Sequence, residues 1–132
     1  MDDSFPVEPF EKLGYSVEVY GQKSYNGVAI ISKIKAKNVK KGFYGFTDSD
    51  QNIEIFLDQK RLISAEINGI KIINVYVPNG SSLESDKFGY KIDWLNCLAS
   101  FIQSIICESL VLIELTFQVA INKFLPNYVK LR

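Results

Sequence analysis

Hydrophobic and polar positions in the first quarter of the chain predict a short helix followed by two strands. Residues 5–13 carry a proline near their start and are followed by Gly14, which is typical of a helix with a defined beginning and end. Residues 15–20 alternate between apolar and polar side chains, whereas residues 28–32 are apolar at successive positions. The turn-rich segment 21–27 between them predicts a hairpin. We expect its second strand to be buried on both faces.

A second hairpin is predicted further along the chain. Residues 61–67 and 71–77 have strand chemistry and flank Asn68-Gly69, a strongly favoured two-residue turn. Residues 42–58 scatter Gly, Asp and Asn among aromatic residues without a period, so an irregular connection is expected there. Residues 33–41 hold five lysines, which we interpret as a solvated strand end or loop rather than a phosphate-binding stripe.

The last third of the chain predicts a long helix and a buried strand. Residues 87–107 are helical by period, and residues 110–119 are nearly all apolar or β-branched, which indicates a strand buried on both faces. The order helix, hairpin, hairpin, helix, strand predicts an α/β or α+β fold, with a mixed sheet and a helix packed on it. The helix stripe expected to face the sheet consists of Ile92, Leu95, Ala99, Ile102 and Ile106.

Composition limits the chemistry that this chain can perform. Fifteen basic residues balance fifteen acidic ones, so DNA would be bound by a local patch and not by a global positive field. The sequence has no histidine, which excludes Ser-His and Cys-His nucleophile pairs and histidine metal sites within it. Cys97 and Cys107 are interpreted as buried thiols. The N-terminus lacks a signal-peptide core and no apolar stretch could span a bilayer, so we expect a cytoplasmic location and no membrane partner.

Three segments, taken together and in order, resemble the exonuclease III family of the endonuclease/exonuclease/phosphatase superfamily. They are FPVEPFEKLGYSVEVYGQKSYNGVAIIS (residues 5–32), RLISAEINGIKIINVYVPNG (61–80) and KFGYKIDWLNCLASFI (87–102). The resemblance implies a partial domain over residues 1–121, with an irregular, diverged tail over 122–132. It also implies part of a four-layered α/β sandwich. The implied chemistry is Mg²⁺-dependent hydrolysis of DNA phosphodiester bonds at abasic sites and 3′ ends.

The same resemblance assigns roles to individual residues. Tyr76, in NVYVPNG, matches the family's active-site tyrosine, whose phenol can bind a phosphate oxygen. Asn79 matches an amide that holds a phosphate, although turn chemistry explains an asparagine there equally well. Lys23 and Tyr25, in GQKSYNG, match a loop that grips the DNA backbone. Arg61 is a candidate for a further contact on the DNA side.

The sequence departs from the family at the metal site. The segment that carries the family's metal-binding glutamate has no counterpart, because the matching region begins downstream of it. Thr116 and Gln118 stand where the family has Asp and Asn, and a threonine hydroxyl cannot act as a carboxylate at neutral pH. Glu114 could compensate only from a different backbone position. Tyr76 is then the one catalytic residue in place, and we expect no bound Mg²⁺ and no activity from the chain alone.

Three interpretations of this pattern stay open. The chain is a truncated, degraded family member, or half of a split nuclease whose second chain carries the rest, or a non-catalytic DNA-binding module. In the last case Lys23, Tyr25 and the lysines of residues 33–41 would bind DNA. The expected partner is duplex DNA with abasic sites. Half of a two-sheet sandwich leaves apolar faces uncovered, so we expect the isolated chain to be marginally stable or to associate.

Overall fold

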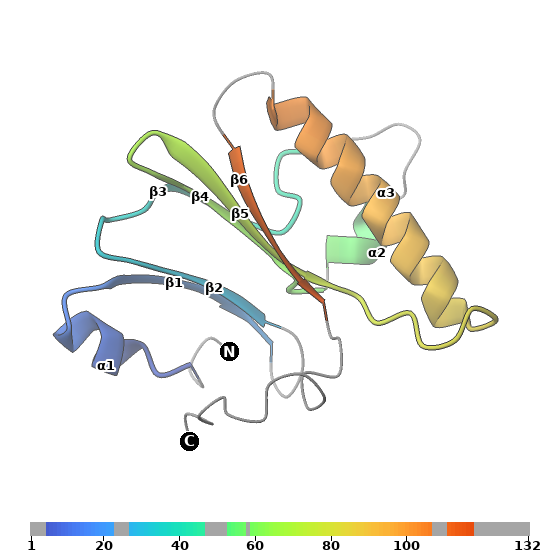
Figure 1. The fold of residues 1–132 in the computed structure, drawn as a ribbon, viewed down its shortest axis with the longest axis horizontal. Helices are drawn as coiled ribbons and strands as arrows, with labels where there is room; N and C mark the ends of the chain where they lie inside the picture. The colour runs from blue at the N-terminus through green and yellow to red at the C-terminus, as the bar shows by residue number, and fades with distance from the viewer. Residues whose placement is uncertain (1–4, 23–26, 47–52, 58, 107–110, 118–132) are drawn as a thin grey trace.

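A computed structural model describes residues 5–22, 27–46, 53–57, 59–106 and 111–117. Within these ranges the strands form a two-stranded sheet, β1-β2, and a four-stranded sheet in the order β3-β4-β5-β6 (Figure 1). This is the mixed α/β arrangement that the element order predicts. The elements are α1 (Val7–Lys12), β1 (Ser16–Gly21), β2 (Gly27–Ser32), β3 (Lys37–Lys41), α2 (Glu54–Leu57), β4 (Leu62–Ile67), β5 (Ile70–Val77), α3 (Asp86–Ile106) and β6 (Val111–Phe117).

The four-stranded sheet is covered on both faces. Side chains alternate between the faces of a strand, so Ile63 and Ala65 of β4 contact β2, whereas Leu62 packs on the other side with α3. Figure 1 shows the small sheet along one face of the large sheet and α3 along the opposite face. The four-layered sandwich stays a prediction, because the described residues show two packed sheets with α3 against the larger one.

Both predicted hairpins are confirmed. Asn68 and Gly69 have positive φ angles of 53° and 79°, which is the conformation that a two-residue I′ turn requires. The turn joins Ile67 to Ile70, which face each other in the register of β4 and β5. β1 and β2 pair antiparallel from Ser16↔Ser32 to Gly21↔Gly27. β5 and β6 are parallel, and α3 makes the long crossover that a parallel pair needs.

The buried stripe of α3 differs from the predicted one. The residues that face the sheet are Trp94, Cys97, Leu98 and Phe101. Of the predicted stripe, Leu95 and Ile102 are partly buried and pack against this core, whereas Ile92 and Ile106 are 40% and 55% exposed, so the centre of the buried face lies to one side of the predicted stripe. The physical reason is aromatic packing: Trp94 and Phe101 both meet the ring of Phe43 edge-on, at centroid distances of 5.9 and 5.6 Å. Aromatic side chains bury more apolar surface than the aliphatic stripe offers.

Two further expectations need correction. β2 is not buried on both faces: Val28 and Ile30 are buried against the large sheet, but Ile31, on the outer face, is 38% exposed. The reason is that β1-β2 packs on a neighbouring sheet through one face. The connection expected to be irregular contains α2, whose Phe56 is 2% exposed and packs edge-on against Phe43.

Other expectations have mixed outcomes. β3 is a solvent-exposed strand, as the lysine-rich segment predicts. Cys97 is a buried thiol, and Cys107 lies outside the described residues, as does the tail from residue 118 onward. No helix in the described ranges is long and apolar enough to cross a membrane.

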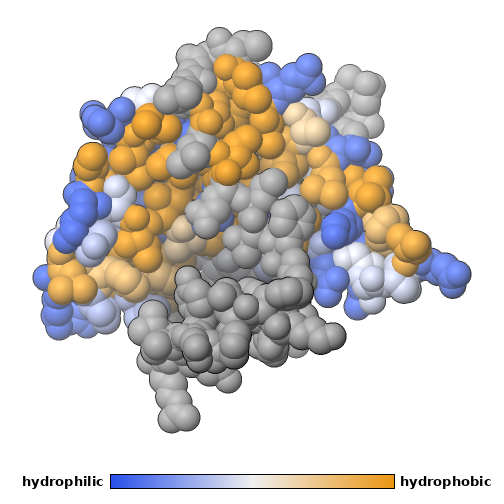
Figure 2. Space-filling view, in the orientation of Figure 1, coloured by the Kyte–Doolittle hydropathy of each residue, from blue (hydrophilic) through white to orange (hydrophobic). Residues whose placement is uncertain are grey.

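Apolar side chains are also present on the surface. Figure 2 shows them across the sheets and α3 on the face that it presents. Ile34, Tyr44 and Leu83 are 51%, 73% and 79% exposed. Single exposed apolar residues are ordinary in soluble domains, so association of the isolated chain stays a prediction.

Candidate functional site

Tyr76 lies near the end of β5, on the face that packs toward the small sheet. Its half-buried ring contacts the cluster formed by Val28, Ile30 and their neighbours. Its backbone N–H donates to the carbonyl of Arg61, at 2.8 Å. The residue beside it on β6 is Thr116, because the parallel register pairs Tyr76 with Thr116. Thr116, where the sequence resemblance predicts an aspartate, is therefore adjacent to the tyrosine in register, while Gln118 lies outside the described residues.

Arg61 is packed onto Tyr76. Its guanidinium carbon lies 5.0 Å from the centroid of the Tyr76 ring, and Nη1 donates to the Tyr76 carbonyl at 3.3 Å. Nε donates to Gln59 Oε1 at 3.1 Å. Burial lowers the pKa of Arg61, and the nearby Tyr90 and Tyr76 oppose that shift. An arginine so held stays charged at neutral pH. The structure thus brings two predicted site residues together, and the DNA contact of Arg61 stays a prediction.

Tyr90 of α3 is the third aromatic residue near this arginine. Its ring packs edge-on against Phe56 with a centroid distance of 5.4 Å. The hydroxyl is buried and has no hydrogen-bond partner among the described residues. Burial raises the pKa of Tyr90, and the charge of Arg61 partly offsets the rise. The phenol therefore resists ionisation in the folded state.

Replacing Tyr90 by phenylalanine should change stability most at alkaline pH. Removing an unpaired buried hydroxyl is expected to be neutral or to stabilise the fold by up to about 1 kcal/mol at pH 8. Because the folded-state pKa of Tyr90 lies above the unfolded value of about 10, its ionisation does not alter stability below that pH. As the pH rises from there through the folded-state pKa, the unfolded chain loses its proton first and the fold loses stability. Urea unfolding at pH 8 and at about pH 11 should show a smaller alkaline loss in Tyr90→Phe than in the parent chain. Equal losses in the two proteins would contradict this.

Asn74 lies on the same face of β5 as Tyr76, two residues earlier. Its Nδ2 donates to the carbonyl of Ala29 at 2.9 Å, which ties the two sheets together. Its Oδ1 is buried without a hydrogen-bond partner in the described part of the chain. Sequence analysis did not single out Asn74. The strand alternation that places it beside Tyr76 on one face could have done so.

The described side chains do not fit the metal that the family resemblance implies. Mg²⁺ is held by carboxylates and other oxygen donors in near-octahedral geometry. Across the ranges that the structure describes, no three His, Cys, Asp or Glu residues gather as a metal site. The orphaned Asn74 Oδ1 is a single neutral donor, which is too little for a divalent cation. We derive no reaction step through a metal from these residues.

A cluster of cations and an aromatic ring lies near Tyr76; of its members, only Lys41 was a DNA-binding candidate from the sequence, as one of the lysines of residues 33–41. The ammonium groups of Lys60 and Lys41 lie 5.3 and 5.9 Å from the centroid of the Tyr20 ring. The backbone N–H of Lys60 donates to Gln22 Oε1 at 3.3 Å. We call Tyr20, Lys41 and Lys60 the basic rim. The signal for it was indirect: antiparallel pairing of β3 with β4 puts Lys41 opposite Ile63 and so near the residues that precede β4.

The remaining predicted contacts have different outcomes. Lys23 and Tyr25 lie outside the described residues. In the sequence they follow Gln22, whose side chain accepts a hydrogen bond from the backbone N–H of Lys60 in the basic rim. Asn79 is exposed, and its Oδ1 accepts a hydrogen bond from the backbone N–H of Ser81 at 3.1 Å. This is the turn chemistry named above as the alternative, and a phosphate contact by Asn79 stays a prediction.

Comparison with known proteins gives this geometry a context. The chain is 38% identical over 85 residues to exodeoxyribonuclease III of Haemophilus influenzae. It superposes on a 3′-5′ exonuclease from Neisseria meningitidis with a TM-score of 0.76 and 32% identity, over 89% of this chain. It superposes on an AP endonuclease from Archaeoglobus fulgidus with a TM-score of 0.71 and 33% identity, over 86% of this chain. The chain is therefore similar to exonuclease III and AP endonucleases over part of their length.

The match to this family is partial in length. The chain spans 29% of the Haemophilus protein, 43% of the Neisseria exonuclease and 41% of the Archaeoglobus enzyme. No family model matches the sequence. A further Neisseria structure is a 3′ phosphatase bound to a product DNA hairpin, and it is 33% identical in sequence with a TM-score of 0.76. The superposition covers 89% of this chain and 43% of that one. The similarity to exonuclease III and its relatives therefore covers less than half of the length of each of them.

Proposed function

We propose that this chain supplies the DNA-binding edge and the tyrosine of an exonuclease III-type site, and that it does not hydrolyse DNA by itself. One observation carries the binding half of this proposal. The consecutive residues Lys60 and Arg61 each lie over an aromatic ring, Tyr20 of the small sheet and Tyr76 of the large sheet. Two cation–aromatic pairs thus lie side by side at one edge of the paired sheets.

Such an edge suits a phosphate backbone. Lysine and arginine side chains neutralise phosphates and release counterions, and aromatic faces pack against sugar or base. The zero net charge of the chain means that attraction comes from this local group and not from the molecule as a whole. Lys23 and Tyr25, which follow Gln22 by one and three positions, would extend the same surface. Duplex DNA with an abasic site is the proposed ligand, by analogy with the relatives.

In this proposal Tyr76 contacts the bound phosphate and does not bind a metal. A phenol can donate a hydrogen bond to a phosphate oxygen and stabilise charge that develops there. Arg61 contacts the Tyr76 ring and its carbonyl, so it is a positioning residue in this proposal. The Mg²⁺ chemistry of the family requires carboxylates in addition. Thr116 and Gln118 occupy the two positions where the family has Asp and Asn, so this chain would not provide those groups.

Neutralising the basic rim should weaken DNA binding without changing the fold. We expect Lys60→Gln and Lys41→Gln each to lower the affinity for duplex DNA and to reduce the slope of log K against log salt by about 0.9. The reason is that each substitution removes one phosphate contact. The measurement is fluorescence anisotropy of a labelled duplex carrying one abasic site, at several salt concentrations.

Lys35→Gln is the matched control. Lys35 is an exposed lysine in the connection after β2, which begins at the opposite end of that strand from Gly27. It should leave both the affinity and the salt slope unchanged. Equal effects of all three substitutions would mean that DNA is attracted by overall charge, and would contradict a localised rim. Absence of salt-dependent DNA binding by the parent chain would contradict the proposed function itself.

A two-chain nuclease is the second candidate. The observation in its favour is that the chain aligns with less than half of each relative, so the other active-site residues would be supplied by further polypeptide. Co-expression with a polypeptide corresponding to the unmatched part of a relative tests it. Metal-dependent incision that needs both chains would support this candidate, and a mixture as inactive as either chain would count against it.

A further inference from the structure

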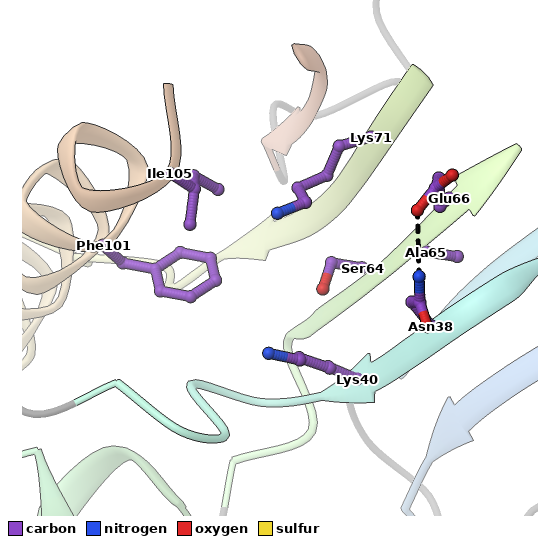
Figure 3. A pocket seen from close by; sticks show the side chains of 8 residues that line it. All are labelled: Asn38, Lys40, Ser64, Ala65, Glu66, Lys71, Phe101 and Ile105. Atoms are coloured by element: carbon purple, nitrogen blue, oxygen red, sulfur yellow. Dashed lines mark hydrogen bonds between the residues drawn. The ribbon is translucent and has the colours of Figure 1, made fainter. Parts of the chain in front are cut away.

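A second concave site lies on the face of the large sheet opposite Tyr76. A partly open cavity of about 190 Å³ lies between β3, β4, β5 and the C-terminal half of α3. Two lysines and one carboxylate are among its lining residues, which are Asn38, Lys40, Ser64, Ala65, Glu66 and Lys71 on the strands and Phe101 and Ile105 on the helix (Figure 3). Strand alternation separates it from the proposed DNA site, because Tyr76 faces the small sheet. It therefore needs an explanation of its own.

The two lysines in this cavity do not pair with the carboxylate nearest in register. Lys71 is paired across β4 and β5 with Glu66, a position at which opposite charges usually interact. Glu66 instead accepts a hydrogen bond from Asn38 Nδ2 at 2.9 Å. Among the described residues neither Lys40 nor Lys71 forms an ion pair. Figure 3 shows both lysine side chains extending from separate strands toward the space beside Phe101.

Two ammonium groups that converge on a partly enclosed space repel each other, and an anion between them removes that repulsion. A phosphate monoester carries about two negative charges at neutral pH, which matches two lysines better than a carboxylate does. Ser64 is 5% exposed and adds a hydroxyl to the strand side of the cavity. Charge-assisted hydrogen bonds from such donors to phosphate are among the stronger polar contacts in proteins.

The wall formed by α3 and the size of the cavity indicate what kind of group would accompany the phosphate. Phe101 and Ile105 offer an apolar surface opposite the amines. A volume of about 190 Å³ admits a small molecule. We propose that this cavity binds a small organic phosphate, with its phosphate between Lys40 and Lys71 and its apolar body against Phe101.

Phenyl phosphate is a suitable probe, because it combines a dianionic phosphate with one apolar ring. Titration of the whole purified chain by isothermal calorimetry should give saturable binding. Lys71→Met and Lys40→Met keep the apolar stems and remove one charge each, and each should weaken binding by about tenfold. Inorganic phosphate should bind more weakly than phenyl phosphate, and phenol should not bind measurably.

Lys35→Met is the matched control for charge, since Lys35 does not line the cavity, and it should bind the probe like the parent chain. Circular dichroism of each variant checks that the fold is kept. Lys40 is exposed, so its substitution tests the site even where Lys71→Met does not fold. The proposal fails if the parent chain shows no saturable binding, if Lys35→Met loses as much affinity as the cavity variants, or if inorganic phosphate binds as tightly as phenyl phosphate. None of these outcomes depends on DNA binding.

Discussion

Replacing Trp94 by alanine is expected to lower the free energy of unfolding by about 3–5 kcal/mol, enough to remove most of the stability of a small domain. Trp94 is 1% exposed at the centre of the interface between α3 and the large sheet. Its ring lies edge-on to Phe43, and Phe43 in turn packs on Phe56 and Phe101. Truncation would leave a cavity that these rigid rings cannot readily fill.

Ile92→Ala is the matched control on the same helix, because Ile92 is 40% exposed. Its expected cost is below about 1 kcal/mol. Urea unfolding followed by far-UV circular dichroism compares the two variants without relying on fluorescence, since the chain has a single tryptophan. Trp94→Phe, which retains most of the volume, should fall between them if Trp94→Ala does not fold. A larger cost at Ile92 than at Trp94 would show that α3 packs with the phase that the sequence suggested.

That contrast shows what the sequence could predict about the fold. The Asn68-Gly69 hairpin was predictable because the turn conformation depends on the two residues themselves. The phase of α3 was not predictable in the same way. Trp94, Leu98, Phe101 and Ile105 recur at spacings of three and four, just as the aliphatic stripe does. The choice between the two stripes is made by Phe43 and Phe56, whose positions depend on the tertiary fold.

Some residues of the candidate site could also be predicted from the sequence, and others could not. Tyr76 could be identified because it lies within a specific motif, NVYVPNG, at the end of a predicted strand. The basic rim could not, because Tyr20, Lys41 and Lys60 come from three segments that only sheet pairing and sheet packing bring together. The cavity beside Phe101 depends in addition on where α3 ends over the strands. Contacts within one motif are local, and contacts between segments need the fold.

The second large effect concerns catalysis. We expect the 132-residue chain to show no Mg²⁺-dependent incision of DNA above background. Loss of a single preorganised group at such a site typically lowers the rate by about a hundredfold to a thousandfold. Thr116 and Gln118 stand where the sequence resemblance predicts an Asp and an Asn, and a threonine hydroxyl cannot take the role of a carboxylate. Losses of this size at several positions together place the rate below detection.

We therefore expect this protein to bind DNA without cleaving it. The basic rim and Arg61 provide cations for phosphates whether or not a metal is present. We expect abasic duplex DNA to be bound, with the salt dependence described above, and to stay intact. A chain that neither binds nor cuts would leave the family relationship in place but would remove the proposed role.

The most direct test is an incision assay on a duplex with one abasic site, in Mg²⁺, at a chain concentration where anisotropy shows the DNA to be bound. Tyr76→Phe, purified in parallel, reports any contaminating nuclease, because such activity would be equal in both preparations. We predict intact DNA with both proteins after prolonged incubation. Incision that requires Mg²⁺, is abolished by EDTA and is lost in Tyr76→Phe would contradict this account.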